Sequence, residues 1–219
     1  MKRIVFTILI FAFITVPVKA DYTYYFQQIT NNPTDYSPDT IAKQLSVVVA
    51  DEGSSQVSFT FYNNVGIQST IAGIFFDDSA GVLSGLTTLD ITDSGSGVSF
   101  SSDLKNFPGG NTIIPLFDTT DSAIADPPPS INGINTSTEW AKLTFTYTTT
   151  FADVINQINA GWMGPSDTLR IGLHVTSIPN GEGTNSNSFI LVPLPATFLL
   201  GLLGLGVGGL KLRKRTLFV

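Results

Sequence analysis

The chain has 219 residues, no cysteine and a formal net charge of −6. Most of its basic residues lie in the first 20 or the last nine positions, so residues 21–182 hold four basic and 17 acidic side chains, a net charge of −13. Such an acidic body excludes a nucleic-acid-binding protein, which needs a basic surface to displace counterions. The absence of cysteine excludes thiol catalysis, zinc–thiolate sites and iron–sulfur clusters.

Residues 1–20 are typical of a cleaved secretory signal peptide. Lys2 and Arg3 form a short positive region, residues 4–16 are almost entirely apolar, and Val18 and Ala20 have the spacing that signal peptidase accepts. The apolar part, about 13 residues, is too short to cross roughly 30 Å of hydrocarbon as a helix. We therefore expect signal peptidase to cleave between Ala20 and Asp21, and the mature chain to be exported.

Residues 21–177 show the hydrophobic pattern of β-strands. In residues 56–63 (QVSFTFYN) the apolar Val57, Phe59 and Phe61 alternate with polar or amphipathic side chains, and residues 142–148 (KLTFTYT) alternate in the same way. Clusters of Gly, Asn, Asp and Pro separate the expected strands. The further strands are expected at residues 22–29, 45–50, 71–77, 86–92, 98–101, 112–117 and 169–177.

One segment has the helical period instead. From Phe151 the apolar residues recur at i, i+3, i+4 and i+7, and Thr150 and Asp153 have the spacing of a capping box. Residues 118–139 have neither period and contain three consecutive prolines, which predicts a long surface loop. The predicted fold is an all-β domain over residues 21–177, a two-sheet, jelly-roll-like sandwich with one short helix.

The single histidine, His174, does not belong to a recognisable catalytic group. In a strand over residues 169–177 it would share one face with Arg170, while Ile171, Leu173 and Val175 would face the core. No second histidine can complete a metal pair, and Ser and Asp are too abundant to define a Ser-His-Asp triad. We expect a structural or surface role for His174.

The carboxylates also do not form a predicted active site. Asp77 and Asp78 are adjacent, so on a strand they would point to opposite faces rather than flank one glycosidic bond. Glu52, Glu139 and Glu182 lie in or beside predicted loops. All five acids are expected at the surface, and no catalytic residue is predicted.

No cofactor is expected, although calcium is left open as an alternative. Residues 75–81 (FFDDSAG), 89–97 (LDITDSGSG) and 117–126 (FDTTDSAIAD) place acids and small polar residues in loops, which suits the oxygen ligands of calcium. None has the spacing of an EF-hand or a nonapeptide repeat. Trp140 and Trp162 could stack on sugar rings, but core positions are expected for both.

The chain ends in a pattern of three parts. Residues 178–191, rich in Gly, Asn and Ser, are expected to be a flexible linker. Pro193 and Pro195 keep the next residues extended. The apolar, glycine-dotted run over residues 196–210 would measure roughly 22 Å as a helix, which is short for a permanent membrane span. The basic cluster after it would hold the end of the chain in the cytoplasm.

These residues resemble the VPLPA variant of the PEP-CTERM sorting signal, with Leu194 where the commonest form has Glu. The residues that carry the resemblance are the motif Val192, Pro193, Leu194, Pro195 and Ala196 and the basic Lys211, Arg213, Lys214 and Arg215. The resemblance implies a Gram-negative exported protein processed by an exosortase, a membrane-embedded cysteine protease or transpeptidase. It also implies association with exopolysaccharide or biofilm matrix. The body, over residues 57–78, 97–111 and 169–189, is similar to a recurrent type among such proteins for which no activity is implied.

Three functions are compatible with the sequence. The leading hypothesis is a non-enzymatic surface or matrix protein, held at the inner membrane as a precursor by residues 192–215 and then released or attached at the cell surface. The alternative is a glycan-binding module, with or without calcium, which needs an exposed aromatic platform. A hydrolase is the third hypothesis, and it needs acids that converge in a pocket.

Overall fold

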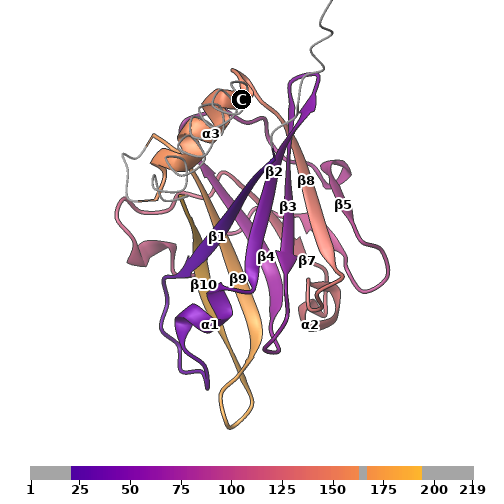
Figure 1. The fold of residues 1–219 in the computed structure, drawn as a ribbon, viewed down its shortest axis with the longest axis vertical. Helices are drawn as coiled ribbons and strands as arrows, with labels where there is room; N and C mark the ends of the chain where they lie inside the picture. Colours follow the sequence, from indigo (N-terminus) through magenta and orange to yellow (C-terminus); the bar gives the residue numbers. More distant parts are fainter. Residues whose placement is uncertain (1–20, 163–166, 194–219) are drawn as a thin grey trace, which may run out of the picture.

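The computed structural model describes residues 21–162 and 167–193. The expected signal peptide, including Ala20, and the tail from Leu194 onward lie outside these residues. The described residues form an almost entirely antiparallel β-structure (Figure 1). The strands are β1 (Tyr22–Gln28), β2 (Leu45–Gly53), β3 (Gln56–Asn63), β4 (Thr70–Asp78), β5 (Ile91–Asp93), β6 (Phe100–Ser102), β7 (Asp121–Ala125), β8 (Trp140–Thr146), β9 (Leu169–Pro179) and β10 (Thr184–Val192). The predicted all-β class is confirmed.

All ten described strands belong to one continuous sheet, rather than to the two separate sheets that we expected. The order is β5-β8-β3-β2-β1-β10-β9-β4-β7-β6, and every neighbouring pair is antiparallel. The sheet folds over on itself, because Phe59 of β3 and Phe76 of β4 pack with ring centroids 5.2 Å apart although four strands separate them in this order. The edge strands β5 and β6 also touch. One core therefore fills the space between the two halves of the sheet.

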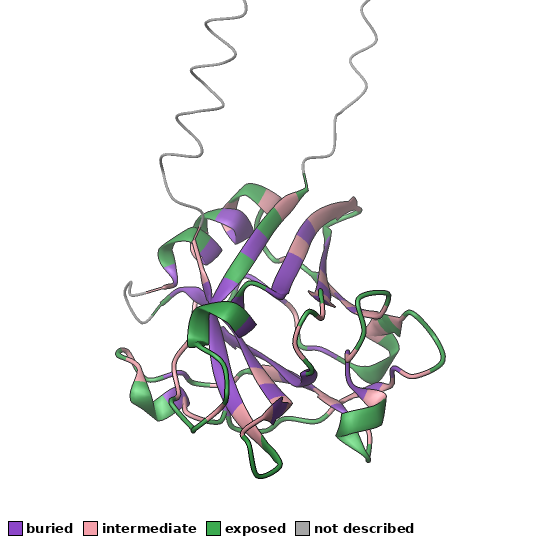
Figure 2. Ribbon diagram, turned by 60° about the horizontal axis from the view of Figure 1, so that its bottom comes forward, coloured by how far each residue is buried: buried purple, intermediate pink, exposed green. Residues whose placement is uncertain are grey.

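The period-two pattern correctly predicts which side chains form this core. Val57, Phe59 and Phe61 of β3 are fully buried, and so is Leu143 of β8, with Phe145 almost so. Buried and more exposed positions alternate along β8, and along β3 from Phe59 onward, whereas Ser58 is also buried. Figure 2 shows the distribution of buried residues over the whole sheet. Fully burying one such side chain contributes roughly 1.5–3 kcal/mol to folding. The core extends over nearly the whole sheet and makes the domain a single unit.

The predicted helix is confirmed as α3 (Phe151–Ala160). Its capping box is formed, since the Thr150 hydroxyl accepts a hydrogen bond from the Asp153 amide at 3.1 Å and the Asp153 carboxylate accepts one from the Thr150 amide at 3.2 Å. Gly161 follows the helix, where a Cβ would lie 2.5 Å from the Leu169 carbonyl oxygen. The expectation of one helix is wrong within the described residues, because α1 (Pro38–Ala42) and α2 (Pro129–Asn132) add two short ones.

A loop over residues 103–120 covers part of the outer face of the sheet, and we call it the lid. Phe107 and Phe117 of the lid pack on Phe75 of β4 and Ile190 of β10, forming a second, smaller core. Gly172 of β9 makes room for it, since a Cβ there would lie 2.6 Å from Cζ of Phe107. The lid replaces the strand predicted at residues 112–117, because its aromatic side chains pack on the sheet instead of extending the ladder.

Two other segments differ from the sequence-based prediction. Residues 86–92 contain a short 3-10 helix, η1 (Thr88–Asp90), and enter β5 only at Ile91. The expected surface loop over residues 118–139 holds β7 and α2. The five-residue strand β7 was not predicted, because residues 118–139 are polar and rich in proline. Ala123 and Ala125 of β7 nevertheless belong to the main core.

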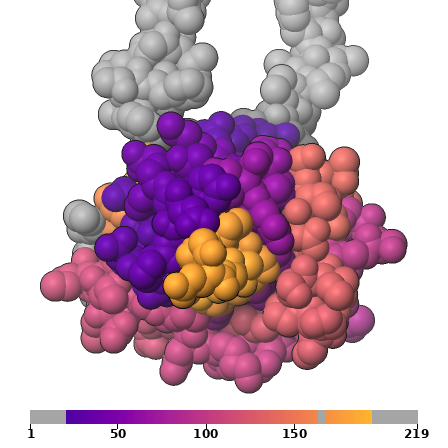
Figure 3. All heavy atoms as spheres, turned by 90° about the horizontal axis from the view of Figure 1, so that it is seen from below, coloured from indigo at the N-terminus to yellow at the C-terminus, as the bar shows by residue number. Residues whose placement is uncertain are grey.

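The prediction of a flexible linker over residues 178–191 is wrong, since these residues form the end of β9, the turn after it and nearly all of β10. β10 lies in the middle of the sheet, between β1 and β9, and joins its two halves. Residues 30–35 are hydrogen-bonded to the start of β10. Figure 3 shows the β9–β10 hairpin, in orange, beside the indigo N-terminal part of the domain. The Asn32 side-chain amide donates to the Ser186 carbonyl at 2.7 Å, and the Asn185 side-chain amide donates to the Pro33 carbonyl at 3.1 Å. These hydrogen bonds order a segment whose composition is typical of a flexible spacer.

Candidate functional site

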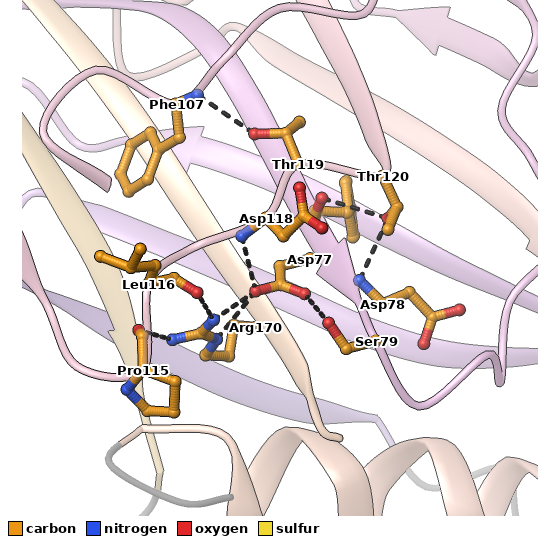
Figure 4. A network of polar contacts seen from close by, with 11 residues as sticks. Asp77, Asp78, Ser79, Phe107, Pro115, Leu116, Asp118, Thr119, Thr120 and Arg170 are labelled. Carbon is orange, nitrogen blue, oxygen red and sulfur yellow. Dashed lines mark hydrogen bonds and ion pairs between the residues drawn. The ribbon is translucent and has the colours of Figure 1, made fainter. Parts of the chain in front are cut away.

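A buried group of polar contacts lies under the lid, around Asp77 and Arg170 (Figure 4). The two residues pair across β4 and β9, and their side chains are 0% and 3% exposed. The Arg170 Nε donates to Asp77 Oδ2 at 3.1 Å, and the Arg170 Nη2 contacts the same oxygen. A buried ion pair requires such satisfied geometry, because both ions have lost their hydration.

The remaining hydrogen-bonding capacity of this ion pair is used by the lid and the adjacent turn. Arg170 donates to the carbonyl oxygens of Pro115 at 2.6 Å and Leu116 at 2.5 Å. Asp77 accepts from the Asp118 amide at 3.1 Å and from the Ser79 hydroxyl at 2.5 Å. The Arg170 guanidinium also lies 5.4 Å from the centre of the Phe117 ring, within the range of a cation–π interaction. These contacts fasten the lid to the sheet.

Asp77 and Asp78 point to opposite faces of β4, as predicted. Asp78 accepts hydrogen bonds from the amides of Val82 at 3.1 Å and Leu83 at 2.7 Å, on the side away from Arg170. Burial raises the pKa of Asp78 although these two bonds oppose the shift. The expected surface position is wrong for both carboxylates, since 0% of Asp77 and 8% of Asp78 are exposed. The two cannot act together on one bond.

The three glutamates do not converge on a common site. Glu52 accepts from the Ser58 hydroxyl at 2.7 Å and pairs with Lys142 at 2.5 Å on the outer face of the sheet. Glu139 accepts from the backbone amides of residues 135 and 136. Glu182 lies in the exposed hairpin tip between β9 and β10. Each carboxylate therefore belongs to a different part of the surface.

The acids considered as calcium ligands organise their own turns. Asp93 accepts from the Gly95 amide at 2.9 Å, and Asp121 accepts from the Leu86 amide at 2.7 Å. Asp126 accepts from two serine hydroxyls, which lowers its pKa. Within residues 21–162 and 167–193, no three His, Cys, Asp or Glu side chains are grouped as metal ligands would be.

The face predicted for His174 is confirmed. Ile171, Leu173 and Val175 are fully buried in the main core, whereas His174 lies half-buried on the outer face. Its Nδ1 lies 3.4 Å from the Ser188 hydroxyl of β10. Burial lowers the pKa of His174 from its ordinary value of 6.5, because desolvation disfavours the imidazolium.

This lowered pKa predicts a loss of stability in weak acid. Near pH 6.5 the unfolded chain takes up a proton on His174 while the folded chain does not, so the free energy of unfolding should decrease as the pH falls through this region. The measurement is urea unfolding at pH 8 and at about pH 5.5, with His174→Gln as the control. Asp78 and Asp121, whose pKa values are raised, give an opposite trend at lower pH in both proteins. Equal pH slopes for wild type and variant would contradict the prediction.

The two tryptophans have different environments. Trp162 is partly buried and packs against the second core, close to the core position expected for it. Trp140 is only half-buried, on the outer face of β8, so the prediction of a core position for it is wrong. In the strand register it faces Tyr62 of β3, for which the sequence predicts no functional role. The polar-face position of Tyr62 was visible in the alternation, but its pairing with Trp140 was not.

The proposed processing sites lie at the boundaries of the described domain. Asp21 directly precedes β1, and Val192 is the last residue of β10, where it pairs with Tyr25. Because β1 and β10 run antiparallel, the start of one and the end of the other lie at the same end of the sheet. Pro193 is described, whereas the other motif residues and the basic cluster are not.

The fold and these contacts define a protein with an antiparallel β-domain whose buried polar groups serve its own loops. No protein-family model, no curated protein and no solved structure matches the chain. Among the described residues, no helix has the length and apolar character needed to cross a membrane. The predicted sites at Leu194, Pro195, Ala196, Lys211, Arg213, Lys214 and Arg215 lie outside the described residues.

Proposed function

We propose that the chain is an exported, non-enzymatic surface or matrix protein that an exosortase processes at residues 192–196. The proposal rests on the three-part tail, in which a proline-flanked motif, an apolar run and a basic cluster follow one another. The observation that carries it is the position of the motif, which begins at the last residue of β10. A processing enzyme that cuts near Pro195 would leave the folded domain intact.

The acidic body and the signal-peptide pattern support the same proposal. The net charge of −13 over residues 21–182 favours solubility outside the cell and disfavours binding to anionic membranes or nucleic acid. The junction with the signal peptide at Asp21 and the start of the sorting motif lie at the same end of the domain. A precursor anchored through its tail would therefore present the opposite end of the domain to the surroundings.

The experiment exchanges Pro193 and Pro195 for alanine in the native host. Both prolines precede the apolar run, so a plain membrane anchor should tolerate the change, whereas a processing enzyme that reads an extended motif should not. We expect uncleaved, membrane-bound precursor to replace most of the mature protein, measured by immunoblot and by mass spectrometry of the C-terminus. Pro33→Ala, at an exposed proline outside the motif, should be processed normally.

The fate of residues 197–219 separates the two possibilities directly. We expect mature protein from the native host to lack them, and a host without an exosortase to retain them. If peptides from residues 211–219 were found on the mature surface protein, the tail would have to be a plain membrane anchor rather than a sorting signal. Unfolding of the Pro193→Ala, Pro195→Ala variant is compared with wild type, because Pro193 is partly buried at the end of β10.

A further inference from the structure

Three aromatic side chains lie in one line across the outer face of the sheet. Trp140 of β8 pairs with Tyr62 of β3, Tyr62 pairs with Ser46 of β2, and Ser46 pairs with Tyr25 of β1. Directly paired residues point to the same face of a sheet. We call Trp140, Tyr62 and Tyr25 the aromatic row. Its four strands lie side by side in Figure 1.

The strand spacing sets the distances between these rings. Neighbouring strands are about 4.8 Å apart, so Trp140 and Tyr62 are separated by one spacing and Tyr62 and Tyr25 by two, roughly 10 Å. Ser46, which lies between the two tyrosines in the strand register, is small and buried. An extended polymer with flat rings at regular intervals could place successive or alternate rings over this row.

Neither core accounts for the aromatic row. Its side chains are exposed or half-buried, 51% exposed in the case of Tyr25, and none of the three packs against either hydrophobic core. Within the described part of the chain, the two phenol groups and the indole N–H have no hydrogen-bond partner. Each ring thus offers an apolar face together with an unused polar group, a combination that suits binding surfaces.

The residues around the row are mainly neutral and hydroxylic. The adjacent row across the same strands is Lys142, Thr60, Val48 and Thr23. Lys142 is paired with Glu52, so this part of the face has little net charge although the body as a whole is strongly acidic. A strongly charged polymer would find no complementary surface here.

A groove continues the row beyond Tyr25. It has a volume of about 310 Å³ and is lined by Tyr25 and Gln27 of β1, Asp39 and Lys43 at α1, and Val192. The amide, carboxylate and ammonium groups of Gln27, Asp39 and Lys43 are hydrogen-bonding partners suited to hydroxyl groups. The aromatic row therefore leads into a groove with polar side chains. This arrangement suits a ligand that has apolar ring faces and hydroxyl groups around the ring edges.

We propose that the aromatic row and this groove bind a neutral, extended polysaccharide chain. Sugar rings stack on Trp140, Tyr62 and Tyr25, and their hydroxyl groups bond to the polar side chains beside the rings. A protein partner would require a contiguous apolar centre, which the hydroxylic neighbours interrupt. A single-stranded nucleic acid would also stack, but it needs a positive groove. The biological role of the site rests on the proposed matrix function, whereas the binding itself does not.

The test measures binding of the purified full chain to insoluble cellulose, chitin and curdlan by co-sedimentation. A detergent without a sugar headgroup keeps the tail soluble and does not compete. We expect binding to at least one of these neutral glycans, and Tyr25→Ala or Trp140→Ala should weaken it at least tenfold, a loss of about 1.4 kcal/mol. Tyr36→Ala is the matched control, because this tyrosine is 40% exposed but lies outside the row.

Several outcomes would overturn the proposal. They are no binding to any of the three glycans, equal losses in the Tyr36→Ala control, or binding abolished by EDTA, which would indicate a metal-dependent site elsewhere. A change in oligomeric state with Tyr25→Ala would assign the row to a second copy of the chain instead. The unfolding midpoints of the variants should match wild type, since the rings contribute little to either core. The sorting experiment uses cleavage as its readout, so failure here leaves its result unaffected.

Discussion

A chain that stops at Gly183 is expected to remain unfolded, whereas a chain that stops at Pro193 should fold as the full chain does. The first truncation removes β10, which is hydrogen-bonded to β1 on one side and β9 on the other. It also removes Phe189, Ile190 and Leu191, which are at most 4% exposed. Three such side chains contribute roughly 4.5–9 kcal/mol, comparable with the whole stability of a typical domain.

The measurement is urea unfolding followed by circular dichroism on both truncated chains. The chain ending at Pro193 retains every described residue, and we expect one cooperative transition with an unchanged slope. The chain ending at Gly183 should show no cooperative transition. A transition within about 1 kcal/mol of the longer chain would mean that residues 184–192 are the spacer that their composition predicts.

The composition of residues 180–188 predicts a spacer, whereas the structure places most of them in or next to the central strand β10. Asn, Gly and Ser in residues 180–188 carry no hydrophobic period, and the apolar residues of β10 begin only at Phe189. The segment is ordered by bonds to residues 30–35, more than 150 positions earlier in the chain. Pairings of this kind depend on tertiary contacts that no local pattern records.

Period-two alternation predicted much of the core because the pattern is local and each strand has one buried face. It placed Phe59 and Phe61 correctly in the main core. It could not reveal that Trp140 lies beside Tyr62, because register across strands depends on the whole fold. The capping box of α3 was predictable for the same reason as the strands, since Thr150 and Asp153 are three residues apart.

The sequence does not predict the lid, because most of residues 103–111 show no hydrophobic period and residues 112–117 have the pattern of a strand that the structure does not contain. Phe107 and Phe117 lie in irregular backbone and pack on an outer sheet face that alternation assigns to solvent. Asp77 and Arg170 are 93 positions apart, and their pairing follows from the β4–β9 register, which no local pattern predicts. The sequence did place Arg170 on the outer face, which becomes a buried position only once the lid covers it.

Arg170→Met is expected to destabilise the domain by roughly 3–5 kcal/mol, because it leaves Asp77 fully buried without its counter-ion. The variant also removes the donors to the carbonyls of Pro115 and Leu116, so the lid should open more readily. Urea unfolding measures the first effect, and faster amide hydrogen exchange over residues 103–120 measures the second. Arg170→Lys keeps the charge but loses the planar fork of donors, and should have a smaller effect.

Comparison with a double mutant identifies the source of this loss of stability. If the uncompensated charge is the cause, Asp77→Leu combined with Arg170→Met should be clearly more stable than Arg170→Met alone, since a buried ion pair can be replaced by apolar side chains at little cost. The matched control is Lys142→Met, which breaks the ion pair with Glu52, where the side chains are 31% and 32% exposed. There we expect a loss of at most about 1 kcal/mol. Equal losses from Arg170→Met and Lys142→Met would show that burial of the Asp77–Arg170 pair has no special weight, and that the lid is held by Phe107 and Phe117 instead.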